Sequence, residues 1–372
     1  MNSLLFGLSL FFGLFGLIWT QQHVNERKCG PPPSRSLTLY QKCENGVIKN
    51  FLNASSQSTL TGPVATLIIP IVYTVVFLVG LPANAVALWV LLTKVKKLPS
   101  VILLVNLALA DLLLILFLPF KAVYYFLGSH WTFGEPMCRI VTAAIYGNMY
   151  CSILCLMLIS IDRYISLVHP FSAKSFRSRM LAISTCAVAW ATAIAAMAPF
   201  VLNKQSYPIN GTDLIICHDV LPESLNTGLF IYYFSFLSGF GFLVPFISIL
   251  FCYVSIVFSM IRHKERFART IKITILVLTV FTVCYIPSHV ILLLHYFRDK
   301  AWQDPLLYLA YMIGLALSTF NSAIDPFLYY YVSDDFRAKV KGALVGLRTQ
   351  ESTQGSQTTQ QSSNKMKSEE II

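Results

Sequence analysis

Apolar residues are concentrated in seven long stretches that shorter polar segments separate. The stretches are centred near Val76, Leu113, Leu154, Val188, Leu243, Leu278 and Leu315. Each is long enough to cross ~30 Å of hydrocarbon at about 1.5 Å of rise per residue. Backbone groups inside a bilayer need hydrogen-bond partners from the chain itself, and the sequence lacks the alternation typical of a membrane barrel. The pattern therefore predicts an all-α membrane protein, a bundle of seven transmembrane helices.

The composition supports this prediction, because 56% of the 372 residues are hydrophobic and only 12% are charged. A soluble domain carries about 25% charged residues. A shorter apolar run, from Leu4 to Ile18, is followed at once by polar sequence. We interpret residues 1–20 as a signal peptide, with an uncleaved eighth span as the alternative. The bundle itself is expected over residues 64–332, surrounded by membrane lipid.

Loop charges predict the orientation of the spans. Basic residues follow spans one and three and separate spans five and six: Lys94, Lys96, Lys97, Lys174, Arg177, Arg179, Arg262, Lys264, Arg266 and Arg269. The opposite loops are acidic, with Glu135, Asp213, Asp219, Glu223, Asp299 and Asp304. The positive-inside rule then places the N-terminus outside the cell and the C-terminus in the cytoplasm, in the plasma membrane. The net charge of +11 follows from this topology, so no nucleic-acid partner is expected. Two glycosylation acceptors, Asn53 and Asn210, fall on the predicted outer side.

Two acidic residues lie inside the predicted spans, where a charge is costly and is usually retained for function. Asp111 is in span two and Asp325 is in the inner half of span seven. Two carboxylates at similar depth repel each other unless they bind a cation or share protons. A buried Na⁺ or a proton-linked pair is the hypothesis, and two protonated residues that hydrogen-bond neighbouring helices are the alternative.

Prolines interrupt five spans and favour kinks; they are Pro82, Pro119, Pro245, Pro287 and Pro326.

A series of residues in the right spans and the right order resembles the rhodopsin-like class of G-protein-coupled receptors. The marks are Asn84, the run Asn106 to Asp111, Cys138, Asp162-Arg163-Tyr164, Trp190, Pro245, Tyr253, the run Phe281 to Pro287, the run Asp325 to Tyr329, and Phe336. The resemblance covers about residues 64 to 345. It implies a receptor that is not an enzyme, with a short amphipathic helix over 333–345 after the last span.

The resemblance also implies roles for individual residues. It implies a disulfide between Cys138 and Cys217 and a sodium site at Asp111, Ser152, Asn321 and Asp325. It implies coupling to heterotrimeric G proteins through Asp162, Arg163, Tyr164, Tyr253 and Tyr329. A switch is implied at Phe281, Tyr285 and Pro287, where Tyr285 replaces the tryptophan usual in the class. The polar tail, 346–372, offers Ser and Thr phosphate acceptors for arrestin.

Within the class, the loop from Cys217 to Glu223 is similar to that of protease-activated receptors. So are Phe133-Gly-Glu135, the run Tyr146 to Tyr150 and the run Ser318 to Phe327. The resemblance is strongest to the types called two and four. Such receptors carry their own agonist, masked until a trypsin-like serine protease such as thrombin or trypsin cleaves the extracellular arm.

The N-terminal arm contains a bond that fits this mechanism. Cleavage after Arg35 removes a pro-segment, 21–35, and exposes an arm, 36–63, that begins with a small residue and then an apolar one. The expected tethered ligand is Ser36, Leu37, Thr38, Leu39 and Tyr40. A flexible tether of about 28 residues extends on the order of 30 Å, which reaches the mouth of the bundle.

The expected ligand site lies at that mouth. The new ammonium of Ser36 is expected to pair with Asp219 or Glu223, beside His218, while the family resemblance places Leu37 in a cleft lined by His295, Tyr296 and Tyr311. The alternative is that the acids are solvated and the aromatic residues belong to an interfacial belt.

Other possibilities stay open from the sequence. Cys29 and Cys43 flank the cut and either pair with each other or do not. A receptor for a diffusible peptide or nucleotide is the alternative function. A transporter or channel would show inverted repeats or a polar pore stripe, and an enzyme would show metal or nucleophile spacing, neither of which is evident. No cofactor is expected beyond a structural Na⁺.

Overall fold

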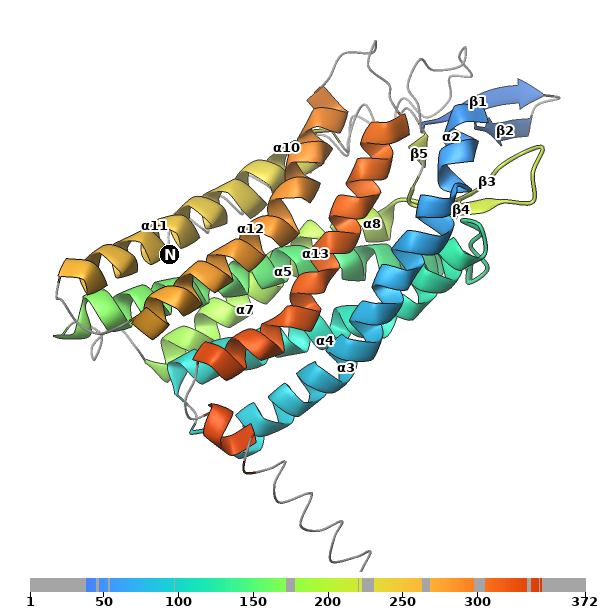
Figure 1. Cartoon of the computed structure of the whole chain (residues 1–372). Helices are drawn as coiled ribbons and strands as arrows, with labels where there is room; N and C mark the ends of the chain where they lie inside the picture. The colour runs from blue at the N-terminus through green and yellow to red at the C-terminus, as the bar shows by residue number, and fades with distance from the viewer. Residues whose placement is uncertain are drawn as a thin grey trace, which may run out of the picture.

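The computed structural model describes residues 38–44, 47–52, 54–96, 98–171, 178–219, 221–222, 231–262, 268–297, 305–332, 336–340 and 342. Seven helical spans of this part are long and apolar enough to cross a membrane, and they form one bundle (Figure 1). They run over Ala54–Thr93, Pro99–Phe126, Gly134–Val168, Arg179–Leu202, Tyr232–Ile261, Ile271–Leu294 and Leu306–Tyr329. The predicted fold class is therefore confirmed, and the chain is a multi-pass membrane protein.

Several spans are built from more than one helical segment. Span one consists of α2 (Ala54–Leu60), the π-helical η1 (Val64–Ile68) and α3 (Ile69–Thr93). Spans two and three are α4 (Pro99–Phe126) and α5 (Gly134–Val168), and span four joins α7 (Arg179–Ala196) to α8 (Ala198–Leu202). Span five consists of α10 (Ile231–Phe236), η3 (Leu237–Leu243) and α11 (Val244–Arg262). Spans six and seven are α12 (Ala268–Phe297) and α13 (Pro305–Val332).

A short helical segment over 336–340 follows the seventh span, as predicted. Its Phe336 is buried and packs edge-on against Tyr329 of α13, with ring centroids 6.4 Å apart. This contact anchors the segment to the end of the last span. Residues 333–335 and 343–372, including the predicted tail, lie outside the described residues.

Prolines shape the spans in two ways. Four of them lie inside helices: Pro82 in α3, Pro119 in α4, Pro287 in α12 and Pro326 in α13. Pro245 instead stands at the start of α11, directly after the π-helical η3. Because proline has no N–H to donate, a carbonyl in the turn before it loses its usual α-helical donor. A π-helical segment is one way to accommodate this loss.

The bundle is polar inside at a few points and apolar outside. Leu78, Ile194 and Phe258 are more than 60% exposed, which suits side chains that face lipid. Inside, the amide of Asn84 donates to the Gly80 and Ser322 carbonyls at 3.0 and 2.7 Å, so it links α3 to α13. These contacts explain why a polar residue is tolerated in an otherwise apolar span.

The five strands of the described residues gather at one end of the bundle, which we call the arm end (Figure 1). β1 (Thr38–Glu44) and β2 (Val47–Phe51) form an antiparallel hairpin, while β3 (Ser206–Pro208) and β4 (Ile215–Cys217) form another. β1 also pairs in parallel with β5 (Leu221–Pro222). The sequence predicts a flexible tether over 36–63, whereas its described part is folded, because its backbone groups pair with each other and with the loop.

The two hairpins are joined by backbone and amide contacts. Asn50 N donates to Asn210 Oδ1 at 3.0 Å, and Asn210 N donates to the Asn50 carbonyl at 2.8 Å. The amide of Asn50 also donates to the Pro208 carbonyl at 3.3 Å. The N-terminal arm is therefore docked on the loop between spans four and five.

Candidate functional site

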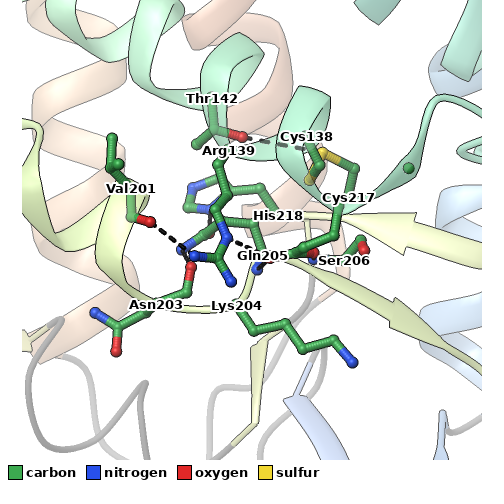
Figure 2. Close-up of polar contacts among 12 residues, drawn as sticks. Cys138, Arg139, Thr142, Val201, Asn203, Lys204, Gln205, Ser206, Cys217 and His218 are labelled. Carbon is green, nitrogen blue, oxygen red and sulfur yellow. Dashed lines mark hydrogen bonds and ion pairs between the residues drawn. A yellow bond between two sulfur atoms is a disulfide. The ribbon is translucent and has the colours of Figure 1, made fainter.

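The loop between spans four and five is fixed to the first turn of α5 by a disulfide. Cys138 in that turn is bonded to Cys217 at the end of β4, with a Cα–Cα distance of 5.8 Å (Figure 2). Both cysteines are fully buried. This is the pairing that the family resemblance implies, and it is confirmed.

A carboxylate gives the same loop a second anchor. Glu135 accepts hydrogen bonds from the backbone N–H groups of Gln205 and Ser206, at 2.8 and 2.6 Å. It also accepts from Arg139 Nε at 2.7 Å. Arg139 in turn donates to the Val201 carbonyl at 2.8 Å (Figure 2). Charge-assisted hydrogen bonds are the strong ones, so this carboxylate orients the start of β3.

Asp219 follows this anchored strand and is already neutralised by a lysine. Lys121 of α4 places Nζ 3.4 and 3.5 Å from the two Asp219 carboxyl oxygens and 3.2 Å from the Cys217 carbonyl. Tyr125 donates to Asp219 Oδ1 at 3.0 Å. The two charged side chains are only 4% and 8% exposed. Asp219 is therefore not solvated in the uncleaved chain, which corrects the alternative expected from the sequence.

His218 connects the loop to spans three and seven. Its backbone has a positive φ of 67°, a region that His enters more readily than most residues. Its Nδ1 lies 2.8 Å from Gln205 Oε1, and its Nε2 lies 3.2 Å from the Tyr146 hydroxyl (Figure 2 shows His218 beside Gln205). The Tyr146 hydroxyl is in turn 2.6 Å from that of Tyr311 in α13.

The protonation state of His218 gives this chain of hydrogen bonds a direction. Removal of the imidazole from water, with Lys121 nearby, lowers the pKa of His218 to about 3. With Gln205 Oε1 as the acceptor, the neutral ring donates from Nδ1, so its Nε2 accepts from the Tyr146 hydroxyl. Tyr146 then accepts from Tyr311. The predicted site residue Tyr311 is thus part of an ordered network inside the bundle, not of an interfacial belt.

Other predicted ligand residues are described only in part. Thr38, Leu39 and Tyr40 form the start of β1, of which only the backbone is described. The side chains of His295 and Tyr296 in α12 lie outside the described part. So do Arg35, Ser36, Leu37, Glu223 and the acceptor Asn53, together with Cys29 and the side chain of Cys43.

The two intramembrane carboxyls meet in the middle of the bundle. Asp111 and Asp325 are both 0% exposed and are close enough to interact electrostatically. Asp111 Oδ1 accepts from Asn148 Nδ2 at 3.3 Å and from Ser152 Oγ at 3.4 Å. Asp325 Oδ2 accepts from Asn321 Nδ2 at 2.7 Å. Among the described residues, the second oxygen of each carboxyl has no hydrogen-bond donor. Hard oxygen atoms with unused acceptor capacity fit an alkali cation.

The predicted switch residues form part of a stacked aromatic column between spans five and six. Phe281 of α12 is nearly parallel to Phe242 and Phe246, with centroids 6.2 and 6.0 Å apart. Its ring lies 5.0 Å from that of Tyr285. Beside Pro287, α13 approaches α12 closely, because a Cβ on Gly314 would lie 3.1 Å from Ser288 Cα. The region around Pro287 is therefore in contact with the spans on either side.

At the end opposite the arm, a cavity of about 140 Å³ opens between spans two, three, five, six and seven. Its lining includes Arg163, Tyr253, Asp325 and Tyr329. Nearby, Ser100 of α4 donates to Asp162 at 2.6 Å, and the Tyr164 hydroxyl is 3.0 Å from His169. Three of the predicted coupling residues, Arg163, Tyr253 and Tyr329, therefore face one cavity.

Comparison with known proteins agrees with this geometry. Residues 83–329 match the family described as 7 transmembrane receptor (rhodopsin family), so the chain has the fold of a rhodopsin-family receptor. Proteinase-activated receptor 4 of Rattus norvegicus is 42% identical over 90% of this chain and 85% of the relative. Proteinase-activated receptor 3 of Homo sapiens is 39% identical over 80% of each chain, and human proteinase-activated receptor 2 is 40% identical over 84% and 81%. The chain belongs to the proteinase-activated receptors, which are not enzymes, and membership implies a protease activator and G proteins.

Three residues of the site were missed from the sequence, and Lys121 is the most informative of them. Lys121 lies in the middle of an apolar run that ends span two, and the rule that intramembrane charges are functional would have found it. Its contact with Asp219 joins segments far apart in the chain. Asn148 and Tyr146 were also missed as site residues, although both lie in a run that resembles the family.

Proposed function

We propose that this receptor is activated when a trypsin-like serine protease cleaves after Arg35 and frees a tethered ligand, Ser36 to Tyr40, that signals to heterotrimeric G proteins. The observation that carries the proposal is the parallel pairing of β1 with β5. Thr38 is opposite Leu221 and Leu39 is opposite Pro222, so the ligand segment already lies along the loop that carries His218 and Asp219.

Tethering explains how a short peptide occupies its site. A linked ligand can reach an effective concentration near mM, so weak intrinsic affinity suffices. The effective concentration of the ligand near the loop is high because hydrogen bonds between Asn50 and Asn210 already hold the arm against the loop. After cleavage the Ser36 ammonium is to pair with Asp219 or Glu223, and Leu37 is to enter the cleft beside His295, Tyr296 and Tyr311.

The proposed orientation places the arm end outside the cell and the Arg163 end in the cytoplasm. The basic loops and the positive-inside rule support it. Asn210 at the arm end is exposed, as a glycosylation acceptor must be. Asn53 is the second proposed glycosylation acceptor. Residues 1–20 are to be removed as a signal peptide.

The signal is to pass from the loop to the cavity through three described groups of contacts. The His218, Tyr146 and Tyr311 network joins the loop to spans three and seven. In the centre, Asp111, Ser152, Asn321 and Asp325 are to hold Na⁺ in the resting receptor. A bound Na⁺ supplies positive charge that reduces the repulsion between the two carboxylates. The Phe281, Tyr285 and Pro287 region is to move span six.

At the cytoplasmic end, span movement is to open the cavity to a G protein. Asp162, Arg163, Tyr164, Tyr253 and Tyr329 are the proposed coupling residues, of which Arg163, Tyr253 and Tyr329 line the cavity. Phosphorylation of the tail, 346–372, adds negative charge and is to recruit arrestin.

The test replaces Arg35 with Ala and measures calcium release in cells after addition of trypsin or thrombin. The variant is expected to be silent to protease and to respond to free Ser-Leu-Thr-Leu-Tyr peptide. Unchanged protease signalling in the variant would refute the cleavage site. Silence of the variant toward the peptide would instead favour the second candidate function, a receptor for a diffusible peptide or nucleotide.

A further inference from the structure

The surroundings of Lys121 Nζ form a cage for a primary ammonium. A primary ammonium has three protons to donate. Here the acceptors around it are the two carboxyl oxygens of Asp219 and the carbonyl of Cys217. The nitrogen also lies 4.6 and 5.0 Å from the ring centroids of Tyr124 and Tyr125, within the range of cation–π attraction. Lys121 itself is only 3% exposed, so the cage is closed to water.

The ion pair in this cage is loose. Charge-assisted N–H to carboxylate hydrogen bonds are usually about 2.7–2.9 Å long. The Lys121 nitrogen is instead 3.4 Å from Asp219 Oδ2 and 3.5 Å from Oδ1, while the shorter contact to Oδ1, at 3.0 Å, comes from Tyr125. Both Lys121 contacts with Asp219 are therefore longer than the Tyr125 contact, so Lys121 is the donor that a closer ammonium can replace.

The register of β1 on β5 suits the approach of a second ammonium, that of Ser36, to the Asp219 carboxylate. In a parallel pair, one step along one strand matches one step along the other. Thr38 is opposite Leu221, and Asp219 lies two residues before Leu221. Ser36, whose α-amine cleavage frees, lies two residues before Thr38. If the strand continues in this register after cleavage, the new ammonium meets Asp219.

We propose that Lys121 and Asp219 form the subsite that recognises a primary ammonium at the first residue of the ligand, with the Lys121 ammonium occupying it before cleavage. The inference rests on the proposed function. On activation the ligand ammonium replaces that of Lys121 on Asp219, because two cations on one carboxylate repel each other. Lys121 keeps its contacts with the Cys217 carbonyl and the tyrosine rings. Lys121 thereby determines how strongly the receptor prefers a free amine.

The test compares two peptides on receptors that carry Arg35→Ala, so that protease cleavage at this bond plays no part. One is Ser-Leu-Thr-Leu-Tyr with a free amine, and the other is the same peptide acetylated at its N-terminus. The quantity measured is the ratio of the two EC50 values, acetylated over free, in a G-protein activation assay. Because both values come from one variant, differences in surface expression cancel in the ratio.

Lys121→Met removes the competing cation, so the ratio should rise on the order of tenfold, a typical coupling between two sites. Lys121→Arg binds the carboxylate as a planar fork and holds it more tightly, so the ratio should fall. Lys94→Met is the matched control, because Lys94 is an exposed residue after span one, over the Trp89 ring. Its ratio should equal that of Arg35→Ala alone.

A ratio that stays constant in both Lys121 variants would overturn the subsite. If Lys121→Met fails to reach the cell surface because Asp219 is left unpaired, the direction of change in Lys121→Arg decides alone. Failure of the proposed function gives a different result: the free peptide would then be silent on Arg35→Ala itself, before any change at Lys121.

Discussion

The Glu135 anchor yields a prediction that separates buried hydrogen bonds from a surface ion pair. Glu135→Ala removes the acceptor of the Gln205 and Ser206 backbone N–H groups, both of which belong to buried residues. A buried donor left unpaired costs about 1–3 kcal/mol. Two such donors, with some access of water, amount to a loss of roughly 2–4 kcal/mol.

The matched control is Arg139→Ala, which breaks the ion pair but leaves both backbone bonds to Glu135. The pair is partly exposed, with side chains 31% and 24% accessible, so it contributes ~0–1 kcal/mol. Its second bond, to the exposed Val201 carbonyl, adds little more. Arg139→Ala should therefore be the milder change.

The assay is thermal unfolding of the purified receptor in lipid nanodiscs, followed by loss of binding of labelled Ser-Leu-Thr-Leu-Tyr peptide. Glu135→Ala should lower the midpoint by several degrees more than Arg139→Ala. Equal midpoints for the two variants would show that the backbone bonds to Glu135 do not hold the loop, and the reasoning would be refuted.

Three further predictions concern other parts of the receptor. The free energy of unfolding should fall as the pH falls below 6.5, because burial and Lys121 lower the pKa of His218 to about 3 in the folded chain, despite the opposing Asp219 charge. At pH 5.5 this contribution amounts to a loss of about 1.4 kcal/mol. Thermal unfolding of His218→Gln should lack that part of the pH dependence. Gly314→Ala places a Cβ 3.1 Å from the Ser288 backbone and should cost roughly 1–3 kcal/mol in thermal stability, whereas Gly239→Ala meets no atom within 4 Å and should be neutral; similar midpoints would contradict the close approach. Replacement of Na⁺ by choline should increase peptide potency in a G-protein activation assay if Na⁺ favours the resting state, and Asp111→Asn should abolish that dependence; an equal response of both receptors to Na⁺ would remove the proposed ion site.

The sequence predicts the spans well because the signal is local. Each run of apolar residues must become a helix of sufficient length in a bilayer, whatever its neighbours are. The depth of Asp111 and Asp325 in their runs was also enough to predict that they meet, since neighbouring spans share one membrane. Residue roles came from family marks, such as Cys138 with Cys217, and not from spacing.

The arm end was harder to predict because its contacts are non-local. Asn50 and Asn210 are 160 residues apart in the chain, yet two hydrogen bonds join them. Nothing in the run from Thr38 to Glu44 specifies a parallel partner, yet Thr38 and Leu39 pair with β5 while Tyr40 to Glu44 pair with β2. The positive φ of His218 likewise follows from the disulfide and the Gln205 contacts around it, which the loop sequence alone does not reveal.

The contact of Lys121 with Asp219 is another non-local contact that the sequence does not reveal. The sequence singles out Asp219 as a possible counter-ion for the Ser36 ammonium, whereas the ammonium that Asp219 contacts in the structure is that of Lys121 in span two. Charge patterns identify which groups need partners. Only the packing of the spans decides which partner is within reach.

The most direct measurement of the central claim uses purified receptor in nanodiscs with a heterotrimeric G protein. Nucleotide exchange is recorded before and after trypsin treatment, for the natural chain and for Arg35→Ala, and the new N-terminus is sequenced. The account predicts a new terminus at Ser36 and faster exchange in the natural chain alone. Equal acceleration in Arg35→Ala, or a new terminus at Ser36 without faster exchange, would contradict it.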